Sequence, residues 1–348
     1  MSGRWMIYGA NGYTGRLIVD EVKRRGLTPI VAGRRREAIE PIAREHDLSA
    51  RIFDVTETKD NLDGVAAILH CAGPFTQTSA PVVEACLASG VHYLDITGEI
   101  SVFEACWAKN DEAKQRGVVL LPGVGFDVVP SDCLAARLAA ELPGATSLEL
   151  AISGGGAPSA GTAKTMLEAL PVGGLIRENG ELRKVPNAWK TIDVDFADKR
   201  RHCMSIPWGD VSTAFHSTKI PNIVVYMAIS ARAARTLQLA EPLLGLFALP
   251  AVRRAAGLVL DRVGLGPKED ERARGRSHLW GRVRDGGGRE VTGTLDTPEG
   301  YTLTATTAVE CAERVVAGGV GAGTQTPSLA FGAGFIAEFP GCELRVKS

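Results

Sequence analysis

The chain has 348 residues, a formal net charge of −1, 45% hydrophobic residues and 23% charged residues. This length favours two domains over one compact core, and the near-neutral charge argues against nucleic acid or an anionic membrane as the main partner. The seven cysteines form no C-x-x-C pair and the six histidines are dispersed, so the pattern indicates free thiols in a reducing cytoplasm and no metal site. We expect neither a signal peptide nor a transmembrane segment, because the longest uncharged stretch, residues 242–252, is too short to span a bilayer.

The first predicted elements are a strand, a glycine turn and a helix in the segment "MIYGANGYTGRLI", residues 6–18. Gly9, Gly12 and Gly15 have the spacing G-x-x-G-x-x-G, and an apolar stripe then continues to a helix stop at Gly26. Glycines at such a turn let backbone amides approach a pyrophosphate, and the helix N-terminus adds partial positive charge. The sequence therefore predicts a dinucleotide site; the alternative is a tight turn without a ligand.

The second predicted strand, "TPIVAG", leads directly into three arginines at 34–36. Arg34 stands nineteen residues after Gly15, where a cofactor with a free ribose 2′-hydroxyl usually meets an acidic residue. A guanidinium suits a 2′-phosphate instead, so we expect NADP(H) rather than NAD. A solvated basic start to the next helix is the alternative, and it fits Arg35 and Arg36 better than Arg34.

Alternating strands and helices continue to about residue 126. The predicted strands are "ARIFDV", "VAAILHCAGPF", "VHYLDITG" and "GVVLLPG", with one helix over 79–89 and another that carries Phe103 and Trp107. Asp54, at the end of the first of these strands, is a candidate for the adenine edge. This order predicts an α/β fold: a Rossmann-type parallel sheet with helices on both faces and a ligand beyond the carboxyl ends of the strands.

The pattern changes after residue 126. We predict a helix in "VVPSDCLAARLAAEL", a strand in "SLELAIS", a glycine-rich entry at 154–161 to the helix "TAKTMLEAL", and a hairpin around Asn179-Gly180. Further strands are expected at "KTIDVDF", "VSTAFHS", "IVVYMAIS", "GRSHLWGRVRD" and "REVTGTLD", followed by the helix "YTLTATTAVECAERVVAG". Residues 127–319 are therefore assigned to an α+β substrate or dimerisation domain with a mostly antiparallel sheet. The glycine-rich entry either holds a substrate oxygen or is an ordinary mobile loop.

Residues 233–263 are rich in leucine and are expected to form two helices broken at Pro250. One interpretation is a buried lid or the surface of a homodimer. The other is an apolar cover over an acyl substrate, or a surface that contacts a carrier protein or a membrane interface.

Five motifs in order, "GANGYTG", "AGR", "CAGPF", "YLDITGE" and "PGVGFDVVPSD", together with "TQTPSLAFGAGFIAEF" near the C-terminus, resemble the saccharopine dehydrogenase-like oxidoreductases. That family includes saccharopine reductases and trans-acting enoyl reductases. The resemblance implies an NADP-binding Rossmann domain over 1–126, interrupted by the substrate domain, with the C-terminal segment 320–348 packing back onto it. It also implies phosphate contacts at Gly9, Asn11, Gly12, Tyr13, Thr14 and Gly15, the 2′-phosphate at Arg34, and the nicotinamide half along Ala72, Gly73 and Pro74.

The catalytic candidates lie near predicted strand ends. They are Tyr93, Asp95, Glu99, Asp127 and Asp132, with Asp127 preferred because it follows Gly125 at the domain junction. Asp132 could instead be a helix cap, and Asp95 and Glu99 could fix loops by hydrogen bonds. There is no Tyr-x-x-x-Lys at Tyr93.

The predicted function is an NADP(H)-dependent oxidoreductase that reduces an activated C=C bond of a small acyl or polyketide-like substrate. Two alternatives stay open. The first is a saccharopine-reductase-like amine or imine oxidoreductase, which needs a carboxylate-binding arginine such as Arg177, Arg201 or Arg232. The second is a protein that binds NADP(H) without catalysis.

Overall fold

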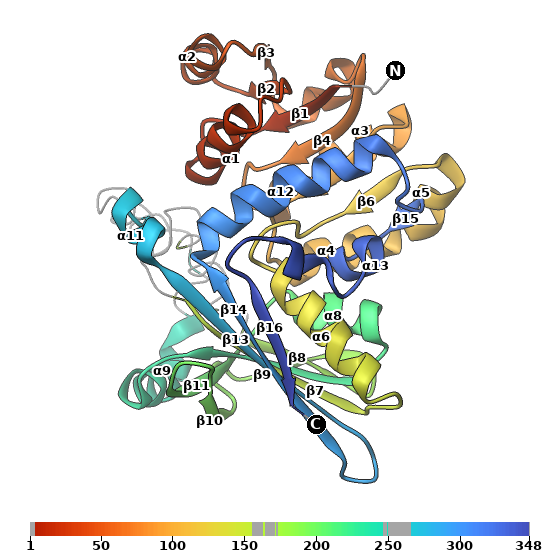
Figure 1. The fold of residues 1–348 in the computed structure, drawn as a ribbon. Coiled ribbons are helices and arrows are strands. Elements are labelled where there is room, and N and C mark those ends of the chain that lie inside the picture. Colours follow the sequence, from red (N-terminus) through yellow and green to blue (C-terminus); the bar gives the residue numbers. More distant parts are fainter. Residues whose placement is uncertain are drawn as a thin grey trace. The chain divides into compact units, whose positions relative to one another are not determined.

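The computed structural model describes residues 4–154, 163, 171, 173–245, 249 and 266–347. The chain divides into two compact units (Figure 1): unit 1 is Met1–Val129 with Tyr301–Phe335, and unit 2 is Pro130–Gly300 with Ile336–Ser348. The chain therefore leaves unit 1 after its first 129 residues and re-enters it at Tyr301.

Unit 1 is built on a seven-stranded sheet in the order β15-β6-β5-β4-β1-β2-β3, and every pairing in it is parallel. Because the strand order reverses around β1, the carboxyl end of β1 marks the crevice where doubly wound folds bind ligands. The strands are β1 (Arg4–Tyr8), β2 (Ile30–Gly33), β3 (Ser49–Ile52), β4 (Val65–His70), β5 (His92–Asp95), β6 (Val119–Leu121) and β15 (Gly323–Thr324).

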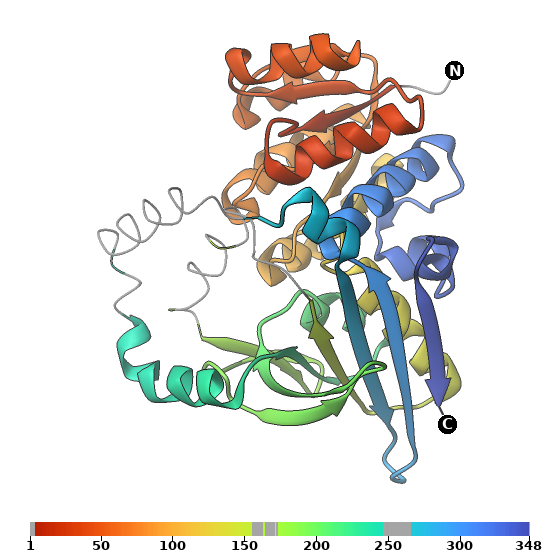
Figure 2. The same ribbon diagram turned by 60° about the vertical axis from the view of Figure 1, so that its left-hand side comes forward.

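Helices cover both faces of this sheet (Figures 1 and 2), which confirms the predicted Rossmann-type arrangement. The central strands are buried on both faces, as a parallel sheet between helix layers requires. The helices are α1 (Tyr13–Arg24), α2 (Arg36–His46), the 3₁₀ helix η1 (Val55–Asn61), α3 (Phe75–Ser89), α4 (Ile100–Ala108), α5 (Asn110–Arg116), α12 (Gly300–Ala317) and α13 (Pro327–Phe331).

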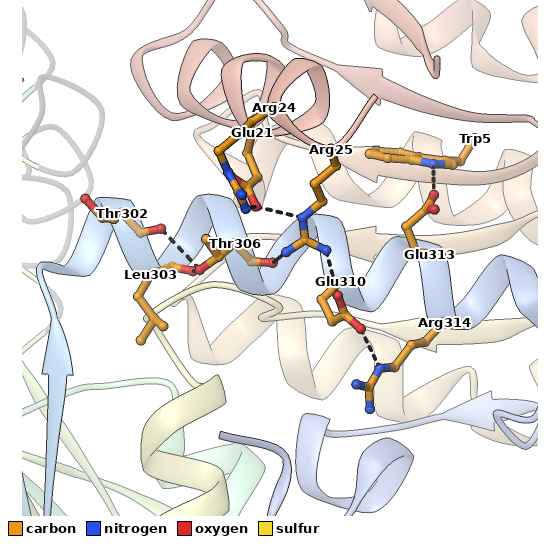
Figure 3. Close-up of polar contacts among 10 residues, drawn as sticks. All are labelled: Trp5, Glu21, Arg24, Arg25, Thr302, Leu303, Thr306, Glu310, Glu313 and Arg314. Atoms are coloured by element: carbon orange, nitrogen blue, oxygen red, sulfur yellow. Dashed lines mark hydrogen bonds and ion pairs between the residues drawn. The ribbon is translucent and has the colours of Figure 1, made fainter. Parts of the chain in front are cut away.

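Polar contacts fix α12 against α1 and β1 within unit 1 (Figure 3). Arg25, just after α1, places one guanidinium nitrogen 2.6 Å from Glu310 Oε2 and donates another to the Thr306 carbonyl at 3.2 Å. Trp5 Nε1, on β1, donates to Glu313 Oε1 at 2.6 Å. A helix that is close to 300 residues from the N-terminus is thereby attached to the first strand and helix of the chain.

Unit 2 holds a mixed sheet in the order β10-β11-β12-β7-β13-β14-β16, with β8 joining β12 and β9 joining β8. Among the described strand pairs of this sheet, only β7–β12 is parallel, which agrees with the predicted mostly antiparallel sheet. The strands are β7 (Ser147–Ser153), β8 (Gly174–Glu178), β9 (Glu181–Val185), β10 (Thr191–Asp195), β11 (Arg200–Ile206), β12 (Asn222–Ala228), β13 (Arg276–Arg284), β14 (Glu290–Pro298) and β16 (Glu343–Lys347).

The described helices of this part of the chain are α6 (Val129–Glu141), α8 (Asp210–Thr218), α9 (Ala231–Leu244) and α11 (Glu269–Arg274). One strand prediction is wrong here, because "VSTAFHS" forms α8. Val211 and Ala214, three residues apart, are both buried, so burial of one helical face prevails over the β-propensity of the segment. The hairpin prediction is confirmed: Asn179 and Gly180 have φ values of 52° and 84°, as a two-residue type I′ turn requires.

The C-terminal part of the chain is divided between the units. We predicted a return to the first domain over 320–348; in the structure, α12 and α13 lie in unit 1, and β16 pairs with β14 in unit 2. The sequence of β16 alternates in exposure, which suits the edge of a sheet. Two predictions concern residues that the structure does not describe. One is the break at Pro250 with the second helix of 233–263, and the other is the segment from 155 through "TAKTMLEAL", of which only residue 163 is described.

Candidate functional site

The turn after β1 forms a cradle of bare backbone. Gly9 has a φ of +88°, and a Cβ there would lie 2.8 Å from Ala72 N. A Cβ on Gly15 would lie 2.3 Å from the Gly9 carbonyl oxygen. Gly12 is the N-cap of α1, and no side chain caps this helix. The first turn of α1 thus presents amides and a positive helix end without a side chain in the way, which fits a diphosphate.

The other predicted phosphate contacts occupy the same turn. Asn11 directs its side chain toward β2, because a Cβ on Gly33 would lie 3.3 Å from Asn11 Oδ1. Tyr13, at the start of α1, packs edge-on against Tyr301 of α12 with ring centroids 4.9 Å apart, and Thr14 follows it in the first turn. The turn is therefore held between β2 and α12.

Arg34 follows β2 and is exposed, and no carboxylate pairs with it among the residues that the structure describes. By contrast, Arg36 is 2.5 Å from Glu40. Burial raises the pKa of Tyr8, at the end of β1, to about 12, and the charge of Arg34 acts in the opposite direction. The guanidinium of Arg34 is thus near the end of β1 and is available to an anion there.

Asp54 occupies the N-cap of η1. Its carboxylate accepts hydrogen bonds from Thr56 N at 3.2 Å and Thr56 Oγ1 at 3.0 Å. Its own amide donates to Glu57 Oε2 at 3.0 Å, which completes a capping box. The side chain therefore has a local structural role at the carboxyl edge of β3.

A neutral histidine, His70, helps to fix the segment Ala72–Pro74, which follows β4. His70 is fully buried, and burial lowers its pKa to about 3. Its Nε2 is 2.9 Å from Thr78 Oγ1, and the Thr78 hydroxyl in turn donates to the Ala72 carbonyl at 2.7 Å. His70 and Thr78 were not predicted as site residues. The signal available in the sequence was a polar residue at the end of an otherwise apolar strand.

Tyr93 and Asp95 form a buried pair that ties β5 to β6. The Tyr93 hydroxyl donates to Asp95 Oδ2 at 2.7 Å, and Asp95 Oδ1 accepts from Thr97 N at 3.0 Å and Gly123 N at 2.8 Å. Burial raises the pKa of Asp95 to about 6, although these hydrogen bonds oppose the shift. Burial also raises the pKa of Tyr93. The pair holds the loop that begins at Gly123.

Glu99 lies at the N-terminus of α3. Its two carboxylate oxygens accept from Phe75 N at 3.2 Å and from Thr76 N at 2.7 Å. A carboxylate at this position satisfies amides that have no partner inside the helix and interacts favourably with the helix dipole. Glu99 therefore fixes the start of α3 beside the Ala72–Pro74 segment.

Asp127 lies on the loop between β6 and α6, half-buried against Gly98. A Cβ on Gly98 would lie 2.7 Å from Asp127 Oδ2, and burial raises the pKa of Asp127 to about 7. The next residue, Val128, has a φ of 125°. A β-branched residue in this region is an outlier that costs about 1–3 kcal/mol, and such outliers concentrate at functional sites.

Sequence comparison identifies the first part of the chain. The profile of the saccharopine dehydrogenase NADP binding domain family matches residues 5–121. This segment belongs to that family. The match confirms the predicted family resemblance, and it confirms NADP(H) as the cofactor of this domain.

Among curated proteins, the bovine saccharopine dehydrogenase-like oxidoreductase is 29% identical over 151 residues, which cover 36% of this chain and 35% of that protein. A protein of Mycobacterium tuberculosis, assigned by name to the trans-acting enoyl reductases, is 30% identical over 184 residues, which cover 47% of this chain and 43% of that protein. The chain therefore spans less than half the length of these two relatives.

Among solved structures, the apo saccharopine dehydrogenase (L-Glu forming) of Saccharomyces cerevisiae aligns over 99% of this chain and 100% of its own. The TM-score is 0.67 at 12% identity, so the two proteins share a fold. The NADP-binding domain contains the glycine cradle, Arg34 and the Ala72–Pro74 segment, and it ends at the strand that precedes Asp127.

Across the described residues, no helix is both long and apolar enough to cross a bilayer. In the same part of the chain, no group of three or more histidine, cysteine, aspartate or glutamate side chains is arranged to hold a metal ion.

Asp132, on α6, is fully buried.

Two of the three arginines considered for binding a carboxylate are bound within unit 2. Arg177 is buried, donates to the carbonyls of Val211 at 2.9 Å and Gly180 at 2.8 Å, and lies over the ring of Phe215. Arg201 forms a two-pronged ion pair with Asp198 at 2.5 and 2.6 Å. Arg232 is exposed at the start of α9.

Proposed function

We propose that this chain is an NADP(H)-dependent oxidoreductase that reduces an activated C=C bond of a small acyl or polyketide-like substrate. The observation that carries the proposal is Asp127, a carboxyl group on the carboxyl side of β6 in the unit that contains the glycine cradle. Burial raises its pKa to about 7, so the group is substantially protonated at neutral pH and is able to donate a proton. A general acid works best with a pKa near the working pH.

We assign the following binding roles to the residues of this chain. The backbone amides from Gly9 to Gly15 and the N-terminus of α1 bind the diphosphate, and Arg34 binds the 2′-phosphate. Asn11, Tyr13 and Thr14 shape the turn, Asp54 borders the adenine side, and the Ala72–Pro74 segment lines the nicotinamide half. NADPH supplies the hydride when bound. Unit 2, rather than the whole of the predicted range 127–319, is assigned to substrate binding and dimerisation, because α12 belongs to unit 1.

The Asp127 carboxyl group donates the proton that completes saturation of the double bond. Tyr93 and Glu99, the other catalytic candidates, are assigned positioning roles, because the Tyr93 hydroxyl is bonded to Asp95 and the Glu99 carboxylate to the amides of α3. Neither group is then needed as an acid.

Two observations favour C=C reduction over the amine or imine alternative. Two of the three arginines considered for a substrate carboxylate, Arg177 and Arg201, are bound to groups of unit 2, which leaves Arg232 as the remaining candidate. The relative that shares 184 aligned residues is named for enoyl reduction. An acyl substrate also agrees with the leucine-rich segment 233–263, and a homodimer or a carrier-protein contact is consistent with the same segment.

The test is NADPH consumption with two panels of compounds. One contains trans-2-enoyl thioesters of increasing chain length, and the other contains cyclic imines and α-keto acids with amines. We expect turnover with the thioesters, and a loss of about a hundredfold in kcat for Asp127→Asn. Asp60→Asn, at an exposed position on η1, is the matched control and should retain full activity.

Turnover of the second panel alone would instead establish the C=N alternative. If the protein binds NADPH and turns over neither panel, it is a non-catalytic NADP(H)-binding protein. Full activity of Asp127→Asn would remove Asp127 from the mechanism.

A further inference from the structure

The loop that carries Asp127 is hydrogen-bonded to α12, a helix that follows it by about 180 residues. The Phe126 amide donates to Thr304 Oγ1 at 2.9 Å. The Thr307 hydroxyl donates to the Val124 carbonyl at 2.8 Å. Both threonines are buried in the described structure. Two hydroxyls of one helix therefore hold the loop at residues 124 and 126, and Asp127 comes directly after the second contact.

The helix and the loop approach each other closely enough to exclude a side chain between them. A Cβ on Gly125 would lie 2.9 Å from Thr304 Cγ2. At its start the loop is held by Asp95, which accepts the Gly123 amide at 2.8 Å. The Asp95 carbonyl also accepts the Val124 amide at 2.8 Å, so the loop has two hydrogen bonds to Asp95 of β5 and two to α12.

The loop also adopts a conformation that its own residues do not favour. Val128 has a φ of 125°, and its amide bonds to the Phe126 carbonyl at 2.9 Å. A β-branched residue with positive φ persists only when its surroundings hold it there. The hydrogen bonds of residues 124 and 126 to α12 lie next to this position and contribute to such a restraint.

The same helix is attached to the cradle side of unit 1. Tyr301, in the first turn of α12, packs against Tyr13 at the start of α1, and Glu310 further along pairs with Arg25 (Figure 3). Because α12 contacts both α1 and the Asp127 loop, it connects the phosphate cradle with the segment that carries the Asp127 carboxyl.

We propose that Thr304 is a positioning residue, whose hydroxyl accepts the Phe126 amide and thereby keeps the Asp127 carboxyl in its place against Gly98. The catalytic meaning of that place rests on the proposed function, but the positioning itself does not. The inference separates two parts of the threonine side chain: the hydroxyl provides the hydrogen bond, and the methyl group provides the contact with Gly125.

The pKa of Asp127 can be used to follow the position of its carboxyl group, because the charged groups on either side of Gly98 in the sequence are already hydrogen-bonded. Asp95, at the end of β5, and Glu99, the N-cap of α4, precede and follow Gly98 in the sequence, and both carboxylates are bonded to backbone amides. On the side of α12, Thr304 and Thr307 carry no charge. Burial is the cause of the Asp127 shift, so a carboxyl group that moves out into water should titrate nearer its ordinary value of about 4.

The experiment compares Thr304→Val, Thr304→Ser and Thr306→Val in the full chain. Valine keeps the shape and loses the hydroxyl, whereas serine keeps the hydroxyl and loses the methyl group. Thr306 is the matched control, because among the described residues its hydroxyl bonds to the Leu303 and Thr302 carbonyls of its own helix and to no group of the loop. The measurements are the titration of the ¹³C-labelled Asp127 carboxyl, identified by its absence in Asp127→Asn, and the hydrogen exchange of the Phe126 amide.

For Thr304→Val we expect the Asp127 midpoint to fall toward its ordinary value and the Phe126 amide to exchange about tenfold faster, since a half-buried donor has lost its acceptor. Thr304→Ser and Thr306→Val should keep both values. An unchanged Asp127 midpoint in Thr304→Val, or an equal fall in Thr304→Ser, overturns the inference.

If Thr304→Val does not fold, the serine variant decides: a folded serine variant with the original midpoint supports the hydroxyl, and a shifted midpoint overturns it. Neither measurement uses turnover. Failure of the enoyl thioester assay therefore defeats the proposed function alone, and an unmoved Asp127 midpoint defeats this inference alone.

Discussion

Replacing Arg34 by alanine removes a guanidinium that has no carboxylate partner among the described residues, so the variant perturbs little of the protein's own structure. We expect the affinity for NADPH to fall and the affinity for NADH to stay within about twofold, because only NADPH carries the 2′-phosphate that Arg34 would bind. The comparison between the two nucleotides isolates one phosphate group.

The magnitude follows from the exposure of Arg34. Hydrogen bonds to charged groups contribute about 1.5–3 kcal/mol, and solvent screening at an exposed side chain places this one near the lower end. A loss of about 1.4 kcal/mol is a tenfold change in Kd. The expected loss is therefore about tenfold, and it should shrink as the salt concentration rises.

The assay is direct titration of NADPH and NADH by fluorescence or calorimetry, which needs no substrate. Arg36→Ala is the matched control: Arg36 is paired with Glu40 at 2.5 Å on α2, and its removal should leave both affinities unchanged. Equal losses for NADPH and NADH in Arg34→Ala, or a larger loss of NADPH affinity in Arg36→Ala, would refute the assignment of the 2′-phosphate to Arg34.

Three further predictions concern the cradle, the acid and the attachment of α12. Gly15→Ala should lower NADPH affinity by more than about tenfold, because its Cβ would lie 2.3 Å from a backbone oxygen; Gly334→Ala, with open space around it, should bind normally in the same titration. The pKa of Asp127 is raised from 3.8 to about 7, so the native state holds a proton that the unfolded state releases, and this contribution to stability is lost as pH rises from about 4 to 7. The Tm advantage of Asp127→Asn over the natural protein should grow across that window in thermal melts, and a difference independent of pH contradicts the shift. Arg25→Met should lower the free energy of unfolding in urea by about 2 kcal/mol, because Arg25 is only 23% exposed and its loss removes the ion pairs with both Glu21 and Glu310. Arg24→Met, at a side chain that is 68% exposed, should cost less than about 1 kcal/mol, and equal costs would show that burial does not matter here.

Local features of the sequence predicted the cradle and one hairpin well. Gly12, Gly15 and the apolar stripe after them lie within a few residues of one another, and α1 forms at Tyr13–Arg24 as the stripe indicates. The turn at Asn179-Gly180 is likewise decided by two adjacent residues with positive φ. In both cases the physical cause of the structure lies inside the segment that was inspected.

Long-range partners explain what the sequence did not reveal. The alternation in "VSTAFHS" favours a strand, but the segment forms part of α8 and buries its first four residues, which depends on elements elsewhere in unit 2. Thr304 is separated from Phe126 by 178 residues, and no local pattern pairs them. The threonines of "TLTATTA" were visible as unusual residues for a helix interior, but their partners were not.

The order of the segments along the chain also has a consequence for biosynthesis. When a ribosome has produced the first 129 residues, β6 still lacks its neighbour β15, and the apolar side of α12, with buried Leu303, Ala308 and Val309, has not yet been made. About half of the polypeptide must therefore be synthesised after β6 before β15 is available to pair with it. A truncated protein that ends after β6 would leave β6 as an unpaired edge strand, which favours aggregation.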